Sequence, residues 1–222
     1  MPDIAIVDYG MGNLRSVSKA LEHVAQGASI SVTSNPEVVR NASRVVVPGQ
    51  GAMPDCLREL DKLGLRKAVV DAALHKPFLG ICLGLQMLFD SSEEGNVRGL
   101  GIVSGKVRRF SAPATTANVG QRLKVPHMGW NQVHQAVAHP MWKGIPQDAR
   151  FYFVHSYYVE TATPEPAAAY THYPFPFTCA VAKDNIFAVQ FHPEKSQESG
   201  LALLSNFVHW QPAAFKSTDS QF

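Results

Sequence analysis

Residues 77–89, PFLGICLGLQMLF, decide the fold. A short apolar run leads into Cys82, which has a glycine two positions away on each side, Gly80 and Gly84, and the next residues look helical. A strand-to-helix turn of this form holds its middle residue at a strained backbone angle, and the flanking positions must be small because larger side chains would collide. The stretch predicts a buried strand that ends at Cys82 and is followed by a helix.

Upstream of this turn, strand-like and helix-like segments alternate. The expected strands are 4–7, 29–33 and 44–47, and the expected helices are 13–24, 53–62 and 65–75. In the first helix, apolar residues recur at positions 14, 17, 21 and 24, which is helical spacing. Alternation of this kind predicts a parallel sheet covered by helices.

Downstream of Gly101 the pattern changes to strands without helices between them, at 102–110, 129–135, 150–160, 178–183 and 186–191. Such runs favour antiparallel pairing. Ser196 can cap a final helix, residues 111–120 are expected to form a surface loop, and residues 211–222 to fray. The prediction is one α/β domain over residues 1–222: three layers, a central mostly parallel sheet flanked by helices, and an antiparallel extension in the second half.

Composition excludes several classes of protein. The 222 residues carry a formal net charge of +2 and no basic block longer than Arg108-Arg109, which argues against nucleic-acid binding. No run of about 18 apolar residues and no signal-peptide pattern occurs, so we expect a cytoplasmic protein without a membrane partner. The three cysteines and nine histidines lack metal-ligand spacing, so neither a metal nor a cofactor is expected.

Cys82 is the candidate nucleophile. A position at a helix start favours the thiolate, and the N–H of Leu83 would point at an oxyanion formed when the sulfur attacks a carbonyl. A second glycine turn, Gly49-Gln50-Gly51 after Pro48, could turn another N–H toward the same oxyanion. The alternatives are a buried structural cysteine and a plain turn after a strand.

His192 and Glu194 are the candidate proton-transfer pair. Residues two apart in an extended chain project to the same side, so the side chains of His192 and Glu194 could meet across Pro193. The carboxylate could then hold one ring nitrogen of His192 while the other ring nitrogen faces Cys82. A core histidine and a solvated acid remain open as an alternative, because 110 residues separate His192 from Cys82.

With these pieces in hand, the sequence resembles the class I glutamine amidotransferases, which have a flavodoxin-like fold and share a PG-G turn, a GICLG-Q elbow and a late HPE. Within that family it is similar to the glutaminase subunits of imidazole glycerol phosphate synthases, which act in histidine biosynthesis. The segments that carry this narrower likeness are 8–14 (DYGMGNL), 125–131 (VPHMGWN), 152–157 (YFVHSY) and 190–196 (QFHPEKS).

The resemblance implies glutamine hydrolysis through a thioester on Cys82, with His192 transferring protons and Glu194 orienting it. It also implies an oxyanion hole from the backbone of Leu83 and of the turn at 49–51. The residues it assigns to glutamine binding are Gln86, His155, Ser156 and Tyr157. Relatives often carry a small apolar residue where this chain has Gln50, which leaves the resting orientation of that peptide open.

The resemblance further implies a partner, a cyclase subunit with a (β/α)8 barrel that receives the ammonia within a heterodimer. The residues expected to face it are Asn13, Trp130, Tyr152 and Lys195, although each also has an ordinary structural reading. Three rival functions stay open: a glutaminase for another pathway such as pyridoxal phosphate synthesis, a catalytically silent scaffold, and a cysteine hydrolase of small esters or peptides.

Overall fold

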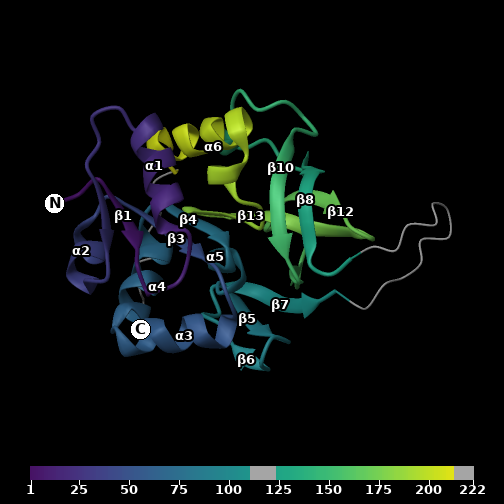
Figure 1. The fold of residues 1–222 in the computed structure, drawn as a ribbon, viewed down its shortest axis with the longest axis horizontal. Helices are drawn as coiled ribbons and strands as arrows, with labels where there is room; N and C mark the ends of the chain where they lie inside the picture. The colour runs from purple at the N-terminus through teal and green to yellow at the C-terminus, as the bar shows by residue number, and fades with distance from the viewer. Residues whose placement is uncertain (111–123, 213–222) are drawn as a thin grey trace, which may run out of the picture.

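The computed structural model describes residues 1–110 and 124–212 (Figure 1). The expected loop at 111–120 and nearly all of the expected tail lie outside these residues. The helices are α1 (Leu14–Val24), α2 (Pro36–Asn41), α3 (Met53–Lys62), α4 (Leu65–His75), α5 (Leu83–Gln86) and α6 (Gln197–His209), with 3₁₀ turns η1 (Pro140–Trp142) and η2 (Pro193–Lys195). None of the helices in the described part of the chain is long and apolar enough to cross a membrane.

The core of the fold is a parallel sheet with four strands from the first half of the chain and one from near its end. Its strands lie in the spatial order β2 (Ile30–Thr33), β1 (Ile4–Val7), β3 (Arg44–Gly49), β4 (Phe78–Cys82) and β14 (Ile186–Val189), and each neighbouring pair is parallel. Strands β1, β4 and β14 are buried along their whole length. Buried parallel strands read as continuous apolar runs, which is how the sequence revealed them.

Helices cover both faces of this sheet and complete three layers. Helices α1 and α6 pack together on one face, and α2, α3 and α4 lie on the other, as Figure 1 shows. Two apolar clusters fill the spaces between the layers, one on each side of the strands. The predicted α/β architecture is confirmed, and the predicted bounds of α3 and α4 match the structure.

The second half of the chain continues the sheet from β14 with mostly antiparallel strands. These are β13 (Pro176–Lys183), β11 (Tyr157–Thr161), β7 (Val103–Arg109), β5 (Phe89–Ser92) and β6 (Val97–Arg98), with β12 (Ala167–His172) and β9 (His134–Gln135) off this path. Strands β7, β11, β13 and β14, all predicted after Gly101, pair antiparallel with one another as expected. Strand β5, the parallel partner of β7, lies before Gly101. Strands β8 (His127–Gln132) and β10 (Arg150–His155) form a separate antiparallel pair.

Several predicted elements need correction. The strand expected over residues 150–160 is two strands, because the chain leaves β10 at Ser156 and enters the main sheet as β11. The helix after Cys82 is a single turn, since Phe89 already begins β5. The strand expected over residues 129–135 is also two strands, β8 and β9, which belong to different sheets. Helix α2 and strands β5, β6 and β12 were not predicted.

Ser196 stands at the start of α6, but its side chain does not cap the helix. The hydroxyl instead donates to the carbonyl of His192 at 2.6 Å and accepts from the Tyr152 N–H at 3.0 Å. It therefore joins two segments that lie more than 40 residues apart in the chain.

Candidate functional site

The sheet itself brings the distant candidate residues together. Gly49 at the end of β3 is the register partner of Cys82 at the end of β4, and Val189 at the end of β14 pairs with Ile81. Carboxyl ends of parallel strands lie along one edge of a sheet, where open α/β folds bind their ligands. The glycine turn, the cysteine and the segment leading to His192 therefore meet at this edge.

The turn at Cys82 has the strained geometry that its glycines predicted. Cys82 has φ 55° and ψ −107°, a conformation that costs a residue other than glycine about 1–3 kcal/mol. A Cβ on Gly80 would lie 2.7 Å from the carbonyl oxygen of Gly84, and one on Gly84 would lie 1.9 Å from the carbonyl oxygen of Val47. Because α5 is only one turn long, its dipole contributes less to stabilising a thiolate than a long helix would.

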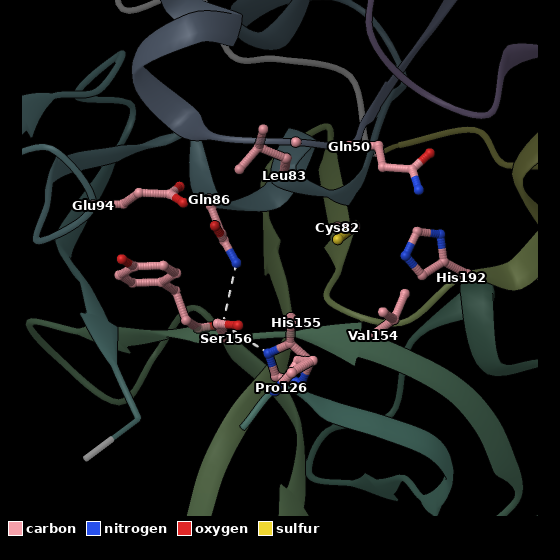
Figure 2. Close-up of a pocket in the computed structure, with 12 residues that line it drawn as sticks. Gln50, Cys82, Leu83, Gln86, Glu94, Pro126, Val154, His155, Ser156 and His192 are labelled. Carbon is pink, nitrogen blue, oxygen red and sulfur yellow. Dashed lines mark hydrogen bonds between the residues drawn. The ribbon is translucent and has the colours of Figure 1, made fainter. Parts of the chain in front are cut away.

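His192 and Glu194 form a buried pair. The Nδ1 of His192 lies 2.9 Å from Oε1 of Glu194, and the two side chains are 4% and 1% exposed. A carboxylate beside Nδ1 holds the proton on that nitrogen, so Nε2 is the atom left to exchange protons with a substrate. Among the residues described, Nε2 has no hydrogen-bond partner, and Figure 2 shows the ring and the Cys82 sulfur facing each other.

The charge state of His192 follows from its neighbours. Burial disfavours the imidazolium, but the neighbouring Cys82 sulfur and the Glu194 carboxylate at Nδ1 outweigh that cost and raise the pKa of His192 to about 10. A histidine with so high a pKa carries a proton at neutral pH. The surroundings of His192 therefore favour the imidazolium beside Cys82 before substrate binds.

A cavity of about 290 Å³ opens beside these groups (Figure 2). Cys82 and His192 both line this cavity. The other walls come from the turn that follows Cys82, the glycine turn at 49–51, the segment where β10 gives way to β11, and single residues elsewhere. The full lining is Gln50, Gly51, Cys82, Leu83, Gln86, Glu94, Pro126, Val154, His155, Ser156, Tyr157 and His192. A pocket of this size fits a small metabolite.

The glycine turn lies against the elbow from the β3 side. A Cβ on Gly49 would be 2.5 Å from the Leu83 Cβ, and Gly51 has φ +103°, so both positions need glycine. The Tyr9 hydroxyl donates to the carbonyl of Pro48 at 2.6 Å, and the Cys56 thiol lies 3.7 Å from the carbonyl of Gln50. Both carbonyls are thereby engaged by buried side chains.

The four residues assigned to glutamine binding all line the cavity, but they offer different groups. His155 is buried with both ring nitrogens engaged, Nδ1 by the carbonyl of Tyr157 at 2.7 Å and Nε2 by Nδ1 of His127 at 2.9 Å. Burial lowers the pKa of His155 to about 3, so the ring is neutral. It can present ring surface to a ligand but no free nitrogen.

Sequence reasoning missed two polar residues at this site. Glu94 lines the cavity and accepts a hydrogen bond from the N–H of Met53 at 2.7 Å, and burial raises the pKa of its carboxyl group. Gln190 is fully buried and donates from Nε2 to the Cys82 sulfur at 3.6 Å. Glu94 follows a β-strand in a polar turn that carries no signal, whereas Gln190 stands two residues before His192, so alternation along an extended segment could have indicated it.

Three of the four residues expected to face a partner form one surface cluster. The rings of Trp130 and Tyr152 meet edge to face with centroids 6.1 Å apart, and Nζ of Lys195 lies 5.9 Å from the Tyr152 ring. Trp130 and its neighbour Met128 are exposed large apolar residues. Asn13 is the residue before α1, which packs against the 3₁₀ turn that carries Lys195.

Comparison with known proteins assigns a family. Residues 5–210 match the model of the family described as glutamine amidotransferase class-I. The curated protein "Imidazole glycerol phosphate synthase subunit HisH" of Nitrosospira multiformis is 75% identical over 212 residues, covering 96% of this chain and all of that protein. The protein of the same name from Nitrosomonas europaea is 64% identical with the same coverage, and that from Thiobacillus denitrificans is 62% identical over 97% of this chain and 94% of its own length.

Solved structures agree on the fold. The structure of PurLQS from Thermotoga maritima aligns with a TM-score of 0.70 at 17% identity, over 94% of this chain and 99% of that one. A putative GMP synthase protein from Thermoplasma acidophilum aligns with a TM-score of 0.67 at 19% identity, over 94% and 93% of the two chains. Identities this low establish the architecture alone.

Proposed function

The chain belongs to the class I glutamine amidotransferase family, and on that premise we propose that it is the glutaminase subunit of an imidazole glycerol phosphate synthase. In this role it hydrolyses L-glutamine to glutamate and ammonia for histidine biosynthesis. Support comes from relatives of that name that align along nearly the whole chain at 62–75% identity. Neither a cofactor nor a metal enters the proposed reaction.

In the proposed mechanism, the Cys82 sulfur attacks the side-chain amide carbon of glutamine. His192, protonated at rest, gives its Nε2 proton to the leaving nitrogen, so ammonia departs and a glutamyl thioester remains. The now neutral Nε2 then takes a proton from water, whose oxygen attacks the thioester and restores the thiolate. Glu194 holds Nδ1 at 2.9 Å throughout, which keeps Nε2 aimed at the reacting atoms.

The oxyanion of each tetrahedral intermediate needs hydrogen-bond donors. We propose the N–H of Leu83 and an N–H from the turn Gly49-Gln50-Gly51, because both segments lie beside the sulfur at one sheet edge. The Tyr9 hydroxyl and the Cys56 thiol engage the carbonyls of Pro48 and Gln50. The peptide between Gly49 and Gln50 is thus the part of the turn we expect to rotate when a partner binds.

The amino-acid portion of glutamine would bind against the cavity wall formed by Gln86, Ser156 and Tyr157. Both amide hydrogens of Gln86 are engaged by other residues, so it offers its oxygen to the substrate. Glu94 lies on the same side of the cavity in Figure 2, and its carboxylate would pair with the α-ammonium group. An ion pair there would offset the cost of partly burying that carboxylate.

The proposed partner is the cyclase subunit, a (β/α)8 barrel that forms a heterodimer with this chain and receives the ammonia. Exposed Trp130 and Met128 and half-buried Tyr152 and Lys195 form a cluster that fits an interface, where aromatic anchors dominate binding. We assign Asn13 to the rim of this surface. The barrel would convert the nucleotide substrate to imidazole glycerol phosphate and aminoimidazole carboxamide ribonucleotide.

We further propose that residues 1–222 form one domain and act in the cytoplasm. Both clusters of core residues contact the same sheet, which supports a single folding unit. The described cysteines are free thiols, which is the state that the reducing conditions of that compartment maintain.

The observation that carries the proposal is the convergence of Cys82, His192 and Glu194 at one buried sheet edge. Its test is the Cys82→Ser variant in complex with the cyclase subunit. We expect glutamine-dependent synthesis to fall about a thousandfold or more, while synthesis from ammonium salts stays unchanged. The matched control is Cys179→Ala, a buried thiol outside the cavity, which should keep both activities. Normal glutamine-dependent turnover by Cys82→Ser would refute the assignment.

A further inference from the structure

A chain of buried amide hydrogen bonds ends at the nucleophile. The Nε2 of Gln86 donates to the carbonyl of Tyr157 at 3.2 Å and to Oε1 of Gln190 at 3.0 Å. The Nε2 of Gln190 then donates to the Cys82 sulfur at 3.6 Å. Gln190 is 0% exposed and Gln86 is 3% exposed, so water does not compete for these groups.

The backbone carbonyl of Tyr157 fixes the direction of the whole chain. A carbonyl oxygen only accepts, so the end of Gln86 that faces it must be the NH₂ group. The second hydrogen of that NH₂ group requires an acceptor, and this is the oxygen of Gln190. The nitrogen of Gln190 consequently faces the sulfur, and an amide flip at either glutamine would place two oxygens or two NH₂ groups in contact.

A hydrogen bond to the charged form of a group favours that form. The N–H of Gln190 therefore favours sulfur as thiolate and holds it on the β14 side of the elbow. We propose that Gln190 is a positioning residue for the Cys82 thiolate, and that Gln86 acts on the nucleophile by orienting Gln190. This inference rests on the proposed glutaminase function and adds a role for Gln190.

The test measures the pH dependence of Cys82 alkylation by iodoacetamide in the complex, together with glutaminase kcat and KM. The Gln190→Met substitution removes the N–H donor to the Cys82 sulfur without adding a charge. The Gln190→Glu substitution places a hydrogen-bond acceptor against the sulfur instead of a donor. We expect the pH of half-maximal alkylation rate to rise by about one unit for Gln190→Met and further for Gln190→Glu. Glutaminase kcat should fall about tenfold or more, with KM changing less than twofold.

Gln86→Met provides the second, indirect variant, because it leaves Gln190 in place but removes the group that orients its amide. It should move the alkylation profile in the same direction by a smaller amount, and the double variant should match Gln190→Met alone, since both changes remove one interaction. Gln26→Glu is the matched control for Gln190→Glu, because it makes the same glutamine-to-glutamate change at an exposed site outside the cavity lining, and it should leave the alkylation profile unmoved.

A shift of less than 0.3 pH units in folded Gln190→Met would overturn the inference, as would fully additive effects of the two substitutions. Folding is checked by the thermal unfolding midpoint. Should Gln190→Met and Gln190→Glu both unfold, the Gln86→Met profile decides alone. Loss of the inference leaves the proposed function standing, because the Cys82→Ser result with glutamine and ammonium tests that function separately.

Discussion

Replacing Ser196 with alanine should weaken both the fold and the catalytic step. Ser196 is 1% exposed, and its hydroxyl bridges two backbone groups, donating to the carbonyl of His192 at 2.6 Å and accepting from the N–H of Tyr152 at 3.0 Å. The N–H of His192 donates to the carbonyl of Tyr152 at 2.9 Å. One side chain thus closes a clamp between β10 and the proposed proton carrier.

The cost of opening this clamp follows from its two hydrogen bonds. One hydrogen bond contributes about 1 kcal/mol net to the free energy of unfolding, and a buried polar group left without a partner costs about 1–3 kcal/mol. Ser196→Ala should therefore lower the free energy of unfolding by about 2–3 kcal/mol, measured by urea denaturation with an unchanged m-value. Because His192 loses one backbone anchor, misplacement of its ring should lower glutaminase kcat about 10- to 100-fold, with KM little changed.

Ser199→Ala is the matched control, since Ser199 is a half-buried serine on the same helix, α6, and outside the cavity lining. It should stay within about 0.5 kcal/mol of the parent protein. A stability change as small as this in Ser196→Ala, combined with an unaltered kcat, would show that the bridge neither stabilises the fold nor positions His192.

Two further predictions concern the elbow and the buried histidines. Gly84→Ala should destabilise the protein by about 3 kcal/mol or more and abolish glutamine hydrolysis, because the Cβ of the alanine would lie 1.9 Å from the backbone oxygen of Val47. A Gly84→Ala variant with normal thermal stability would contradict this packing. The free energy of unfolding, measured by urea titration, should rise between pH 5 and 6.5. Burial lowers the pKa of His127 and His139 to about 4 and that of His155 to about 3, below the unfolded value of 6.5. The unfolded chain therefore binds more protons than the folded chain at these three sites. His192, with its raised pKa, acts in the opposite direction but at one site only, and a flat or falling profile would rule out the neutral buried histidines.

The parts of the fold that sequence predicted well are those with local signals. Apolar spacing gave the helices at 53–62 and 65–75, and continuous apolar runs gave the buried parallel strands. The position of His192 beside Cys82 has no local signal, because it depends on β14 pairing with β4 after a detour of about 100 residues. Only the motif resemblance linked the two segments in advance.

The orientations of the amides at the site were beyond prediction for a different reason. Gln86 was expected to hold substrate, yet its NH₂ group already serves Tyr157 and Gln190. Which end of an amide faces a neighbour depends on the nearest obligate acceptor, and here that acceptor is a backbone carbonyl 71 residues away. Residue type and spacing carry no information about such a contact.

One of the strands whose prediction failed also shapes the pocket. Residues 150–160 alternate in a way that fits a single strand, and no glycine or proline marks a break. The chain nevertheless changes sheets at Ser156, and the residues on both sides of the break, Val154 to Tyr157, all line the cavity. An uninterrupted strand would turn alternate side chains and its hydrogen bonds away from the site. Local pattern and tertiary structure therefore disagree at the segment that binding requires, as expected where function rather than folding selects the conformation.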